Sequence, residues 1–292
     1  MNTDVLCEIL FQAGEEDHAT KRLDEAFALF RDFEQRFSRF QKNNELWALN
    51  QSEKLAVSPE LFEILTQAKQ YYEATAGRFD PSILPLLEQA GYPGASQPHQ
   101  STQKRTFAEL SLDPATRTVT KPYDLLIDLG GIGKGFIVDR VAKVLGQDFE
   151  NVIVDAGGDI SARGANRKEG YNYWAIEVEH PKERYPSVAL LLLSDMAVAT
   201  SGRNRRHWEK NGQEKHHLID PHAGESARPD FLSVTVIAPN TTVADVYAKS
   251  LFIAGRTEGP ALAEQLGLPA IFIESSGSVT INQYAKKYVW QA

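Results

Sequence analysis

The stretch NVIVDAGGDISARG, residues 151–164, has the composition of a strand region, and further strand-like stretches follow it along the second half of the chain. These are YNYWAIEVEHP (171–181), SVALLLLSDMAVATSG (187–202), FLSVTVIAP (231–239) and LPAIFIESSGSVTIN (268–282). Few helical stretches separate them, whereas a doubly wound parallel sheet needs a helix between successive strands. The second half therefore predicts a mixed or mostly antiparallel sheet.

The first half is predicted to be rich in helices. Residues 19–41 repeat phenylalanine at steps of three and four, which is typical of an amphipathic helix. A second helix is expected from Pro59, capped by Ser58, and residues 106–122 read as a hairpin with DPAT as its turn. Residues 93–104 are polar and turn-rich and predict a surface loop. The fold class is α+β, with mixed or mostly antiparallel sheets and packed helices, and no linker divides the chain.

The composition excludes several classes of function. The 292 residues carry a formal net charge of −8, which argues against a nucleic-acid partner because such an interface needs a basic face. The single cysteine, Cys7, rules out an intrachain disulfide and a cysteine-based zinc site. The N-terminal residues lack the features of a secretory signal, and VALLLLS is far shorter than the roughly 18 apolar residues of a membrane span. We expect a cytoplasmic protein without membrane insertion.

A glycine-rich segment is the first candidate site. YDLLIDLGGIGKGFIVDRVAKVLG, residues 123–146, predicts a strand, a turn with four glycines and a helix from about residue 134. Lys134 stands at the helix start, where amide groups and the helix dipole favour an anion, and a phosphate is the natural ligand. The segment is neither a Walker loop nor a dinucleotide-binding fingerprint. The alternative is a tight strand-to-helix connection without a ligand.

A second candidate lies within residues 198–226. Thr200 and Ser201 could hold phosphate oxygens, and His217 could move a proton near neutral pH. The alternative is a structural histidine, which is the commoner role. A Ser-His-Asp hydrolase is a weaker interpretation, because ATSGR is not a nucleophile elbow.

A third candidate is the helix VADVYAKSLFIAG, residues 243–255, in which Asp245 and Lys249 are one turn apart. A solvated ion pair is the simplest interpretation. However, few other polar side chains occur in this helix, which predicts that it is largely buried and that the two charges are paired.

Together these segments resemble the FAD:protein FMN transferases, the ApbE family, from residue 1 to about residue 281. The matching motifs are Met1 to Thr3, FSRFQKNNELWALN, TAGRFDPSILPLLEQAGY, IDLGGIGKGFIVD, VIVDAGGDISARG, VATSGRNRR through HHLIDPHAG, and VTVIAPNTTVADVYAKSLFIAG. The resemblance implies one two-lobed ApbE-like flavin transferase domain over residues 1–292. It implies that FAD is the donor, that its FMN half is attached to a threonine hydroxyl of a target flavoprotein, and that AMP is released. An FAD-binding carrier or sensor with a degenerate metal site, and an FAD pyrophosphate hydrolase, are the alternatives.

The resemblance also assigns roles to residues of this chain. The predicted cofactor-binding residues are Met1, Phe40, Arg78, Phe79, Asp80, Asp128, Lys134, Thr200, Ser201 and His217. Of these, Lys134, Thr200 and Ser201 were already proposed above as phosphate-binding residues. His217 and Asp245 are the predicted catalytic residues.

The family's magnesium ion implies a third set of residues. Its ligands would be the carbonyl of Gly131, the carboxylate of Asp245 and the side chain at position 249, where the family has threonine and this chain has Lys249. A charged lysine has no lone pair for a metal. We therefore expect its ammonium to lie against Asp245 near the metal position.

Overall fold

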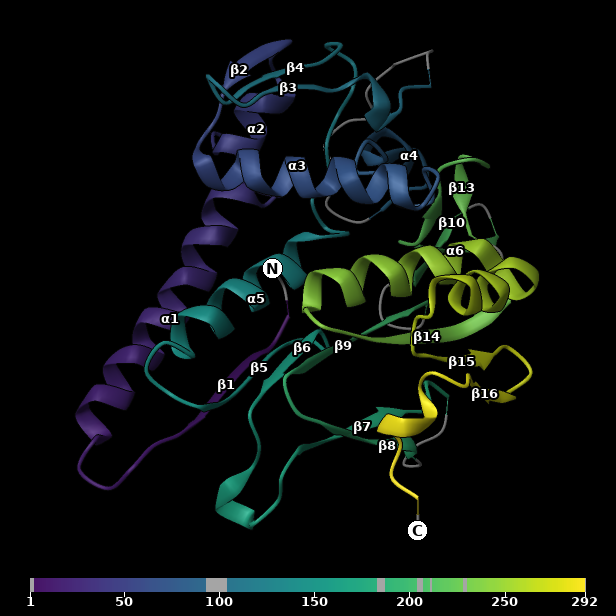
Figure 1. Ribbon diagram of the computed structural model, residues 1–292. Coiled ribbons are helices and arrows are strands. Elements are labelled where there is room, and N and C mark those ends of the chain that lie inside the picture. Colours follow the sequence, from purple (N-terminus) through teal and green to yellow (C-terminus); the bar gives the residue numbers. More distant parts are fainter. Residues whose placement is uncertain are drawn as a thin grey trace. The chain divides into compact units, whose positions relative to one another are not determined.

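Figure 1 shows the computed structural model, which describes residues 3–92, 104–182, 187–203, 207–210, 212–227 and 230–291. The chain forms two compact units, each made of separate segments. The first unit contains Met1–Asp32, Lys134–Gly202 and Pro229–Ala292, and the second contains Phe33–Gly133 and Arg203–Arg228. The predicted loop at residues 93–104 lies almost entirely outside the described residues.

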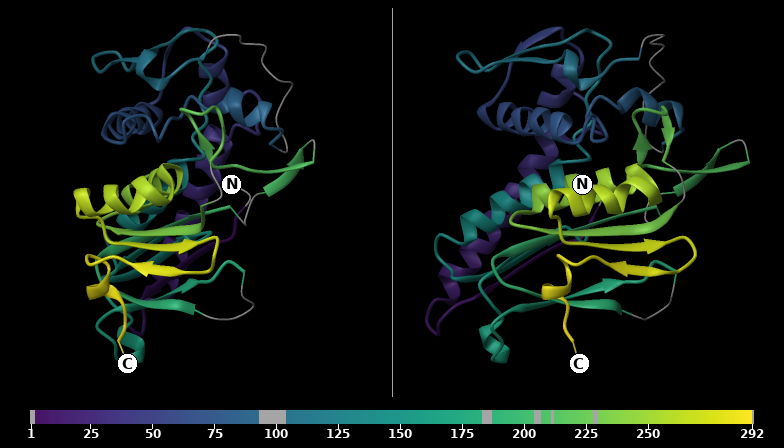
Figure 2. Two further views of the ribbon diagram at one scale, coloured as in Figure 1. Left: turned by 90° about the vertical axis from the view of Figure 1, so that its right-hand side faces the viewer. Right: turned by 45° about the vertical axis from the view of Figure 1, so that its right-hand side comes forward.

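The first unit contains a seven-stranded sheet in which every neighbouring pair of strands is antiparallel (Figure 2). In spatial order its strands are β1 (Val5–Leu10), β5 (Asn151–Ala156), β6 (Ile160–Arg163), β9 (Met196–Gly202), β14 (Phe231–Ala238), β15 (Ala270–Glu274) and β16 (Val279–Ile281). This confirms the predicted mixture of helices and mostly antiparallel strands.

The opening stretch, residues 151–164, forms the hairpin of β5 and β6. Gly157 and Gly158 connect the strands with φ angles of 67° and 89°, a left-handed conformation that glycine adopts without strain and that two-residue hairpin turns require. The Asp155 carboxylate accepts a hydrogen bond from the Gly158 amide at 2.7 Å. Asp159 follows directly, so the turn places its side chain at the end of the hairpin.

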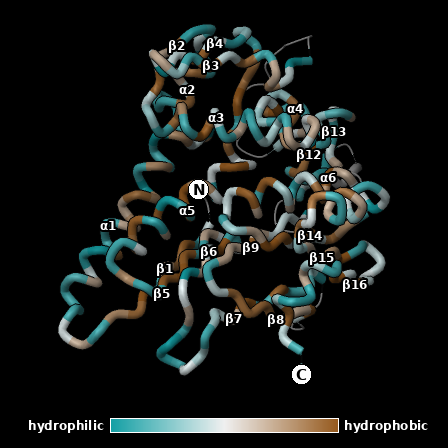
Figure 3. Tube along the Cα trace, in the orientation of Figure 1, coloured by the Kyte–Doolittle hydropathy of each residue, from teal (hydrophilic) through white to brown (hydrophobic). Residues whose placement is uncertain are grey.

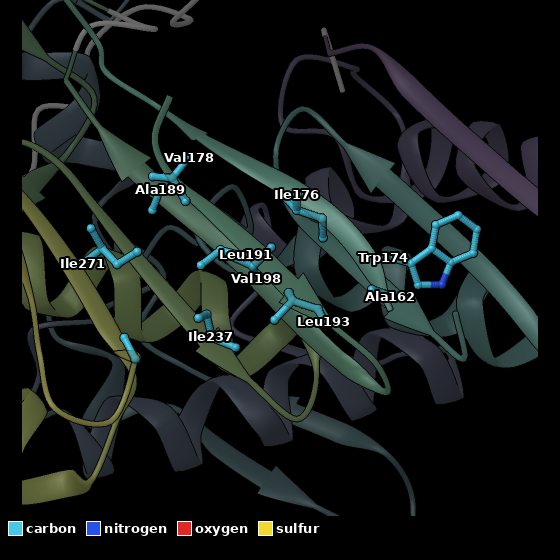
Figure 4. Packing of buried hydrophobic residues seen from close by; sticks show 11 residues of the cluster. Ala162, Trp174, Ile176, Val178, Ala189, Leu191, Leu193, Val198, Ile237 and Ile271 are labelled. Carbon is cyan, nitrogen blue, oxygen red and sulfur yellow. The ribbon is translucent and has the colours of Figure 1, made fainter. Parts of the chain in front are cut away.

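A second hairpin, β7 (Trp174–Glu179) with β8 (Ser187–Leu193), provides part of the unit's core. Buried and exposed residues alternate along β7, as expected when one face of a strand is covered. Figure 4 shows its buried side chains, including Trp174 and Ile176, packed with Val198 of β9 and Ile237 of β14. Of the two strands, which Figure 3 colours by hydropathy, β8 has the continuously hydrophobic sequence VALLLL, whereas β7 alternates apolar residues with glutamate.

Two helices of the first unit matter for the site. They are α5 (Gly133–Leu145) and α6 (Thr241–Leu266), and the latter changes direction at Gly255, where φ is 74°. Asp139 of α5 accepts hydrogen bonds from the amides of Thr241 and Thr242 at 2.7 and 2.9 Å, which ties the start of α6 to α5. On the other side, Ala244 of α6 packs against β9 and β14. The two short 3-10 helices of the unit are Arg167–Glu169 and Lys286–Tyr288.

Helix α1 (Glu16–Phe37) enters the second unit, and it is shorter than predicted. The sequence pattern extended to residue 41, but the helix ends at Phe37 because the following residues have other partners. The Ser38 carbonyl accepts a hydrogen bond from the Asn44 side chain at 2.7 Å, and Arg39 pairs with Asp128.

The second unit also contains one longer helix, α3, and several short helices and strands. They are α2 (Glu45–Asn50), α3 (Pro59–Ala74), α4 (Leu84–Gln89), the 3-10 helix Phe107–Glu109, the sheet of β2 (Lys54–Ala56), β4 (Thr118–Thr120) and β3 (Ser111–Asp113), the hairpin of β10 (His207–Lys210) and β11 (Gln213–His216), and the hairpin of β12 (Ile219–Asp220) and β13 (Glu225–Ser226). Ser58 caps α3 as predicted, since its hydroxyl accepts from the Leu61 amide at 3.2 Å. The hairpin predicted in residues 106–122 is also present, as β3 and β4.

The strand predicted before the glycine turn is absent, and this prediction is wrong. Residues 125–129 are irregular because their backbone groups bond outside any sheet. The side chain of Asn50 bonds both the amide and the carbonyl of Ile127, at 2.8 and 2.9 Å, and the Asp128 amide donates to the Pro81 carbonyl at 2.8 Å. Across the described residues, the structure contains no helix with the length and apolarity of a membrane span.

Candidate active site

The hairpin turn of β5 and β6 brings a buried carboxylate to the start of α5 in the first unit. The Asp159 side chain is 1% exposed and forms an ion pair with Lys134, the second residue of α5. An anion so completely buried needs a paired cation. The lysine predicted to face a phosphate therefore already has a carboxylate partner, which the sequence reasoning missed.

The predicted pair in α6 is present. Lys249 Nζ lies 3.0 Å from Asp245 Oδ1, and the two side chains are 15% and 5% exposed. The second oxygen, Asp245 Oδ2, is buried and accepts no hydrogen bond. The Asp245 carboxylate thus has one oxygen on an ammonium group and one that a further donor or cation could use.

The electrostatics show that these two pairs form one cluster, which we call the charge quartet: Lys134, Asp159, Asp245 and Lys249. Burial and, after it, the nearby negative charge of Asp245 together raise the pKa of Asp159 to about 6. Lys134 and Lys249 oppose this rise in the Asp159 pKa. The Asp159 carboxylate therefore responds to both lysines and to Asp245, as expected for a compact group with low solvent exposure.

Strand β9 separates the two hydroxyl residues that the sequence analysis placed together. Successive residues of a strand point to opposite faces. Thr200 hydrogen-bonds with Thr235 across β14 at 2.8 Å, on the same face as Val198, which packs with the β7 and β8 hairpin. Ser201 shares the opposite face with Ala199, which packs with α6. Of the two hydroxyls, Ser201 is therefore the one on the side of the α6 helix.

In the second unit, Asp128 organises the glycine-rich turn. One carboxylate oxygen, Oδ1, accepts the amide hydrogen of Gly130, and the other, Oδ2, lies 2.7 Å from Arg39 Nε. The two side chains are only 7% and 9% exposed. A Cβ on Gly130 would lie 2.7 Å from Asp128 Oδ1, so the close approach of this carboxylate requires glycine. Gly131, the predicted metal residue, is the next residue of this turn.

Arg39 also supports a group of aromatic rings. Its guanidinium lies 4.3 Å from the centre of the Phe40 ring and 4.6 Å from that of Tyr92, and the Tyr92 ring meets Trp208 edge to face at 5.2 Å. The predicted flavin-contacting Phe40 is 52% exposed, and a planar ligand ring could stack on such a surface. Arg39, which sequence reasoning also missed, thus joins these rings to the glycine turn.

The predicted cofactor turn at residues 78–80 follows α3. Phe79 is buried at 3% exposure, and its amide donates to the Thr75 hydroxyl at 3.1 Å. Asp80 Oδ1 accepts from both the amide and the hydroxyl of Ser82, and burial raises the pKa of the Asp80 carboxyl. Phe79 and Asp80 therefore already have structural partners, and Arg78 begins the same turn.

The adjacent histidines His216 and His217 differ in burial, as expected for neighbouring residues at a strand. His216, the last residue of β11, is buried, and its ring Nε2 lies 3.1 Å from the Ala227 carbonyl. His217 follows the strand and is half-buried, which leaves it better placed for proton transfer with a bound substrate. Asp220 closes the next turn, accepting from the amides of His222 and Ala223.

The predicted site residues therefore fall into two groups. The first unit holds Lys134, Thr200, Ser201, Asp245 and Lys249, and the second holds Phe40, Arg78, Phe79, Asp80, Asp128, Gly131 and His217. Met1 lies outside the described residues. The missed residues had weak local signals: Asp159 follows a glycine pair that reads as a turn, and Arg39 lies in an apparently continuous helix.

Known proteins resemble the chain over most of its length. A protein of Haemophilus influenzae and one of Vibrio cholerae, both named FAD:protein FMN transferase, are 30% and 31% identical to it; they align with 91% and 94% of this chain and with 83% and 85% of their own lengths.

Among solved structures, the ApbE protein of Thermotoga maritima superimposes with a TM-score of 0.86 at 26% identity, covering 99% of this chain and 100% of that protein. The flavin transferase ApbE of Vibrio cholerae gives a TM-score of 0.84 at 27% identity, covering 99% and 96%. Residues 1–272 match the ApbE family as a whole, and the chain belongs to the ApbE family.

Proposed function

We propose that the chain is an FAD:protein FMN transferase, which moves the FMN half of FAD to a threonine hydroxyl of a target flavoprotein and releases AMP. The observation that carries this proposal is the alignment of more than nine-tenths of the chain with two proteins of that name. The paired charges of α5 and α6 and the glycine turn beside an aromatic surface are features that a nucleotide substrate requires.

The proposed reaction is a phosphoryl transfer. The acceptor hydroxyl oxygen attacks the phosphorus of the FMN half and forms the new P–O bond. The bond from that phosphorus to the bridging oxygen breaks, and AMP leaves with this oxygen. His217, half-buried beyond β11, accepts the proton of the acceptor hydroxyl. Positioning and charge neutralisation provide most of the rate enhancement in such reactions.

Each group of residues has a part in this proposal. In the first unit, Lys134 and Ser201 contact the phosphates, because such groups offer positive charge and a hydrogen-bond donor. In the second unit, the backbone amides of the turn at Gly130 and Gly131 are suited to an anion. Phe40, held by Arg39, stacks on the flavin ring. Arg78, Asp80 and Asp128 keep the surrounding turns in place or contact the nucleotide directly.

The family implies a magnesium ion, and Asp245 and Lys249 of the first unit occupy its expected position. Asp245 Oδ2 is buried without a donor, and this favours a cation there. However, Lys249 already places a positive charge 3.0 Å from the other oxygen and offers no lone pair. Throughout the described parts of the chain, no group of three or more histidine, cysteine, aspartate or glutamate side chains could hold a metal. These residues do not fit a magnesium shell, and no step of the proposed reaction uses one.

The test is to incubate the purified protein with FAD and a peptide that carries the acceptor threonine, and to measure flavinylated peptide and AMP together. Equal amounts of both products support the transferase. AMP and FMN without modified peptide would indicate a hydrolase, and bound FAD without AMP would indicate a carrier. Either result, obtained with several acceptor peptides and with and without magnesium, would overturn the proposal.

A further inference from the structure

We infer that the ammonium group of Lys249 is the resident cation of the Asp245 carboxylate, so that this chain carries a covalently attached charge at a position where a divalent metal would otherwise bind. The inference about metal binding stands on the charge quartet alone. Its consequence for FAD, which is weak dependence on magnesium, rests on the proposed function.

The pair of Asp245 and Lys249 is largely buried. An exposed Asp-Lys pair one helical turn apart contributes little and leaves both groups free to move. Here Asp245 is 5% exposed and Lys249 is 15% exposed, and Nζ lies at hydrogen-bonding distance from Oδ1. At such burial the lysine is the counterion that allows the carboxylate to remain charged.

The positive and negative charges of the charge quartet balance. Lys134 pairs with Asp159 as Lys249 pairs with Asp245, so the quartet holds two positive and two negative groups and its formal charge is zero. A divalent ion added to it would bring two uncompensated positive charges into a poorly hydrated place. If Lys249 were neutral, the formal charge would become −1, and a cation would be attracted to the uncovered oxygens.

The Asp245 carboxylate has one oxygen without a hydrogen-bond donor. Asp245 Oδ2 is buried and accepts no hydrogen bond. A carboxylate oxygen in this state is costly unless a positive charge is close, and the ammonium on the neighbouring oxygen supplies it. The same oxygen, together with an oxygen introduced at position 249, would offer a metal two ligands.

The experiment measures the thermal unfolding of the protein without FAD, with and without magnesium chloride at constant ionic strength. The variants are Lys249→Thr, which removes the charge and adds an oxygen, Lys249→Met, which only removes the charge, and Lys249→Arg, which keeps it. Lys143→Thr, on an exposed lysine in the last turn of α5, is the matched control.

We expect the unfolding midpoint of the parent, Lys249→Arg and Lys143→Thr to be insensitive to magnesium. Without magnesium, Lys249→Thr and Lys249→Met should unfold about 6 °C lower or more, because each leaves a buried carboxylate uncompensated. Magnesium should restore about 2–4 °C to Lys249→Thr and less to Lys249→Met.

Two results would overturn the inference. The first is a saturable stabilisation of the parent by magnesium that Asp245→Asn abolishes, because it would show that Lys249 leaves the metal position open. The second is a Lys249→Met variant as stable as Lys143→Thr, since the pair would then be an ordinary surface contact. If Lys249→Thr does not fold, the parent, Lys249→Arg and Asp245→Asn still show whether magnesium binds at Asp245.

A separate arm measures FAD affinity by quenching of flavin fluorescence, with magnesium and with a chelator. The affinity of the parent should agree within about twofold between the two conditions. Complete failure to bind FAD would overturn the proposed function and leave the unfolding result unaffected. A large gain of FAD affinity with magnesium in the parent would overturn the inference and leave the proposed function intact.

Discussion

The ion pair of Arg39 and Asp128 predicts a large loss of stability when Arg39 is replaced by methionine. Methionine keeps much of the side-chain volume but removes the guanidinium, which leaves the Asp128 carboxylate charged at 7% exposure and without its cation. Breaking a buried pair by removing one partner costs about 3–5 kcal/mol. The stacking of the guanidinium on Phe40 and Tyr92, at 4.3 and 4.6 Å, adds roughly 0.5–1 kcal/mol for each ring. We therefore expect the free energy of unfolding to fall by at least about 3 kcal/mol.

The assay is urea unfolding near pH 7, read as the change in the free energy of unfolding. Arg31→Met is the control, since Arg31 is an exposed residue of α1, the helix that precedes Arg39, and its replacement should change stability by no more than about 0.5 kcal/mol. The double variant Arg39→Met with Asp128→Asn should recover much of the loss. Its neutral amide strands no charge, and the amide oxygen can still accept from the Gly130 amide.

This prediction also has a functional readout. Loss of Arg39 frees the Phe40 ring and the Asp128 carboxylate together, so the affinity for FAD should fall in Arg39→Met and recover only partly in the double variant. A stability loss below about 1 kcal/mol, or a double variant less stable than the single one, would refute the reasoning, because Arg39 would then not be the partner on which Asp128 depends.

Three further predictions concern other parts of the fold. Asp139→Asn should destabilise the protein by about 1.5–3 kcal/mol in thermal unfolding, because the amide loses charged hydrogen bonds to the start of α6, including the one to the Thr242 amide; an unchanged midpoint would contradict this role. Burial lowers the pKa of Lys121 to about 8, so the folded state binds the ammonium proton less well than the unfolded state. The charged lysine therefore destabilises the folded state at pH 7, and this destabilisation is relieved as the pH rises above about 8. Lys121→Met should accordingly stabilise the protein at pH 7 by up to about 3 kcal/mol, with a gain that shrinks towards pH 10, and a gain independent of pH would count against the buried charge. Gly157→Ala should destabilise by about 1–3 kcal/mol in urea unfolding, because φ is +67° and the new Cβ would overlap the Thr3 hydroxyl; full stability would mean that the turn can rearrange.

Several strands could be predicted from the sequence because their pattern is local. Along β7, alternate residues are buried, and this period of two is visible in the amino acids themselves. The caps and the β3 and β4 hairpin were equally readable, since Ser58 and the DPAT turn act on neighbouring residues.

The errors arose where the partner is distant in sequence. Residues 125–129 have the apolar composition of a strand, but Asn50, 77 residues away, bonds both backbone groups of Ile127. In the same way, α1 stops at Phe37 because Arg39 pairs with Asp128. No window of neighbouring residues contains these contacts, so composition and periodicity cannot reveal them.

The site followed the same rule, and this changes the interpretation of Lys134. From the sequence, the lysine at a helix start after four glycines was an available charge for a phosphate. The structure gives it Asp159, which the glycine turn of the β5 and β6 hairpin positions. A paired lysine still attracts an anion, but with less net charge. Under the proposed function, binding of a pyrophosphate near this pair would therefore depend more on directed amide donors than on free positive charge. The hairpin that determines the antiparallel sheet therefore also sets the electrostatics of the candidate site, because one turn supplies both the strand reversal and the buried carboxylate.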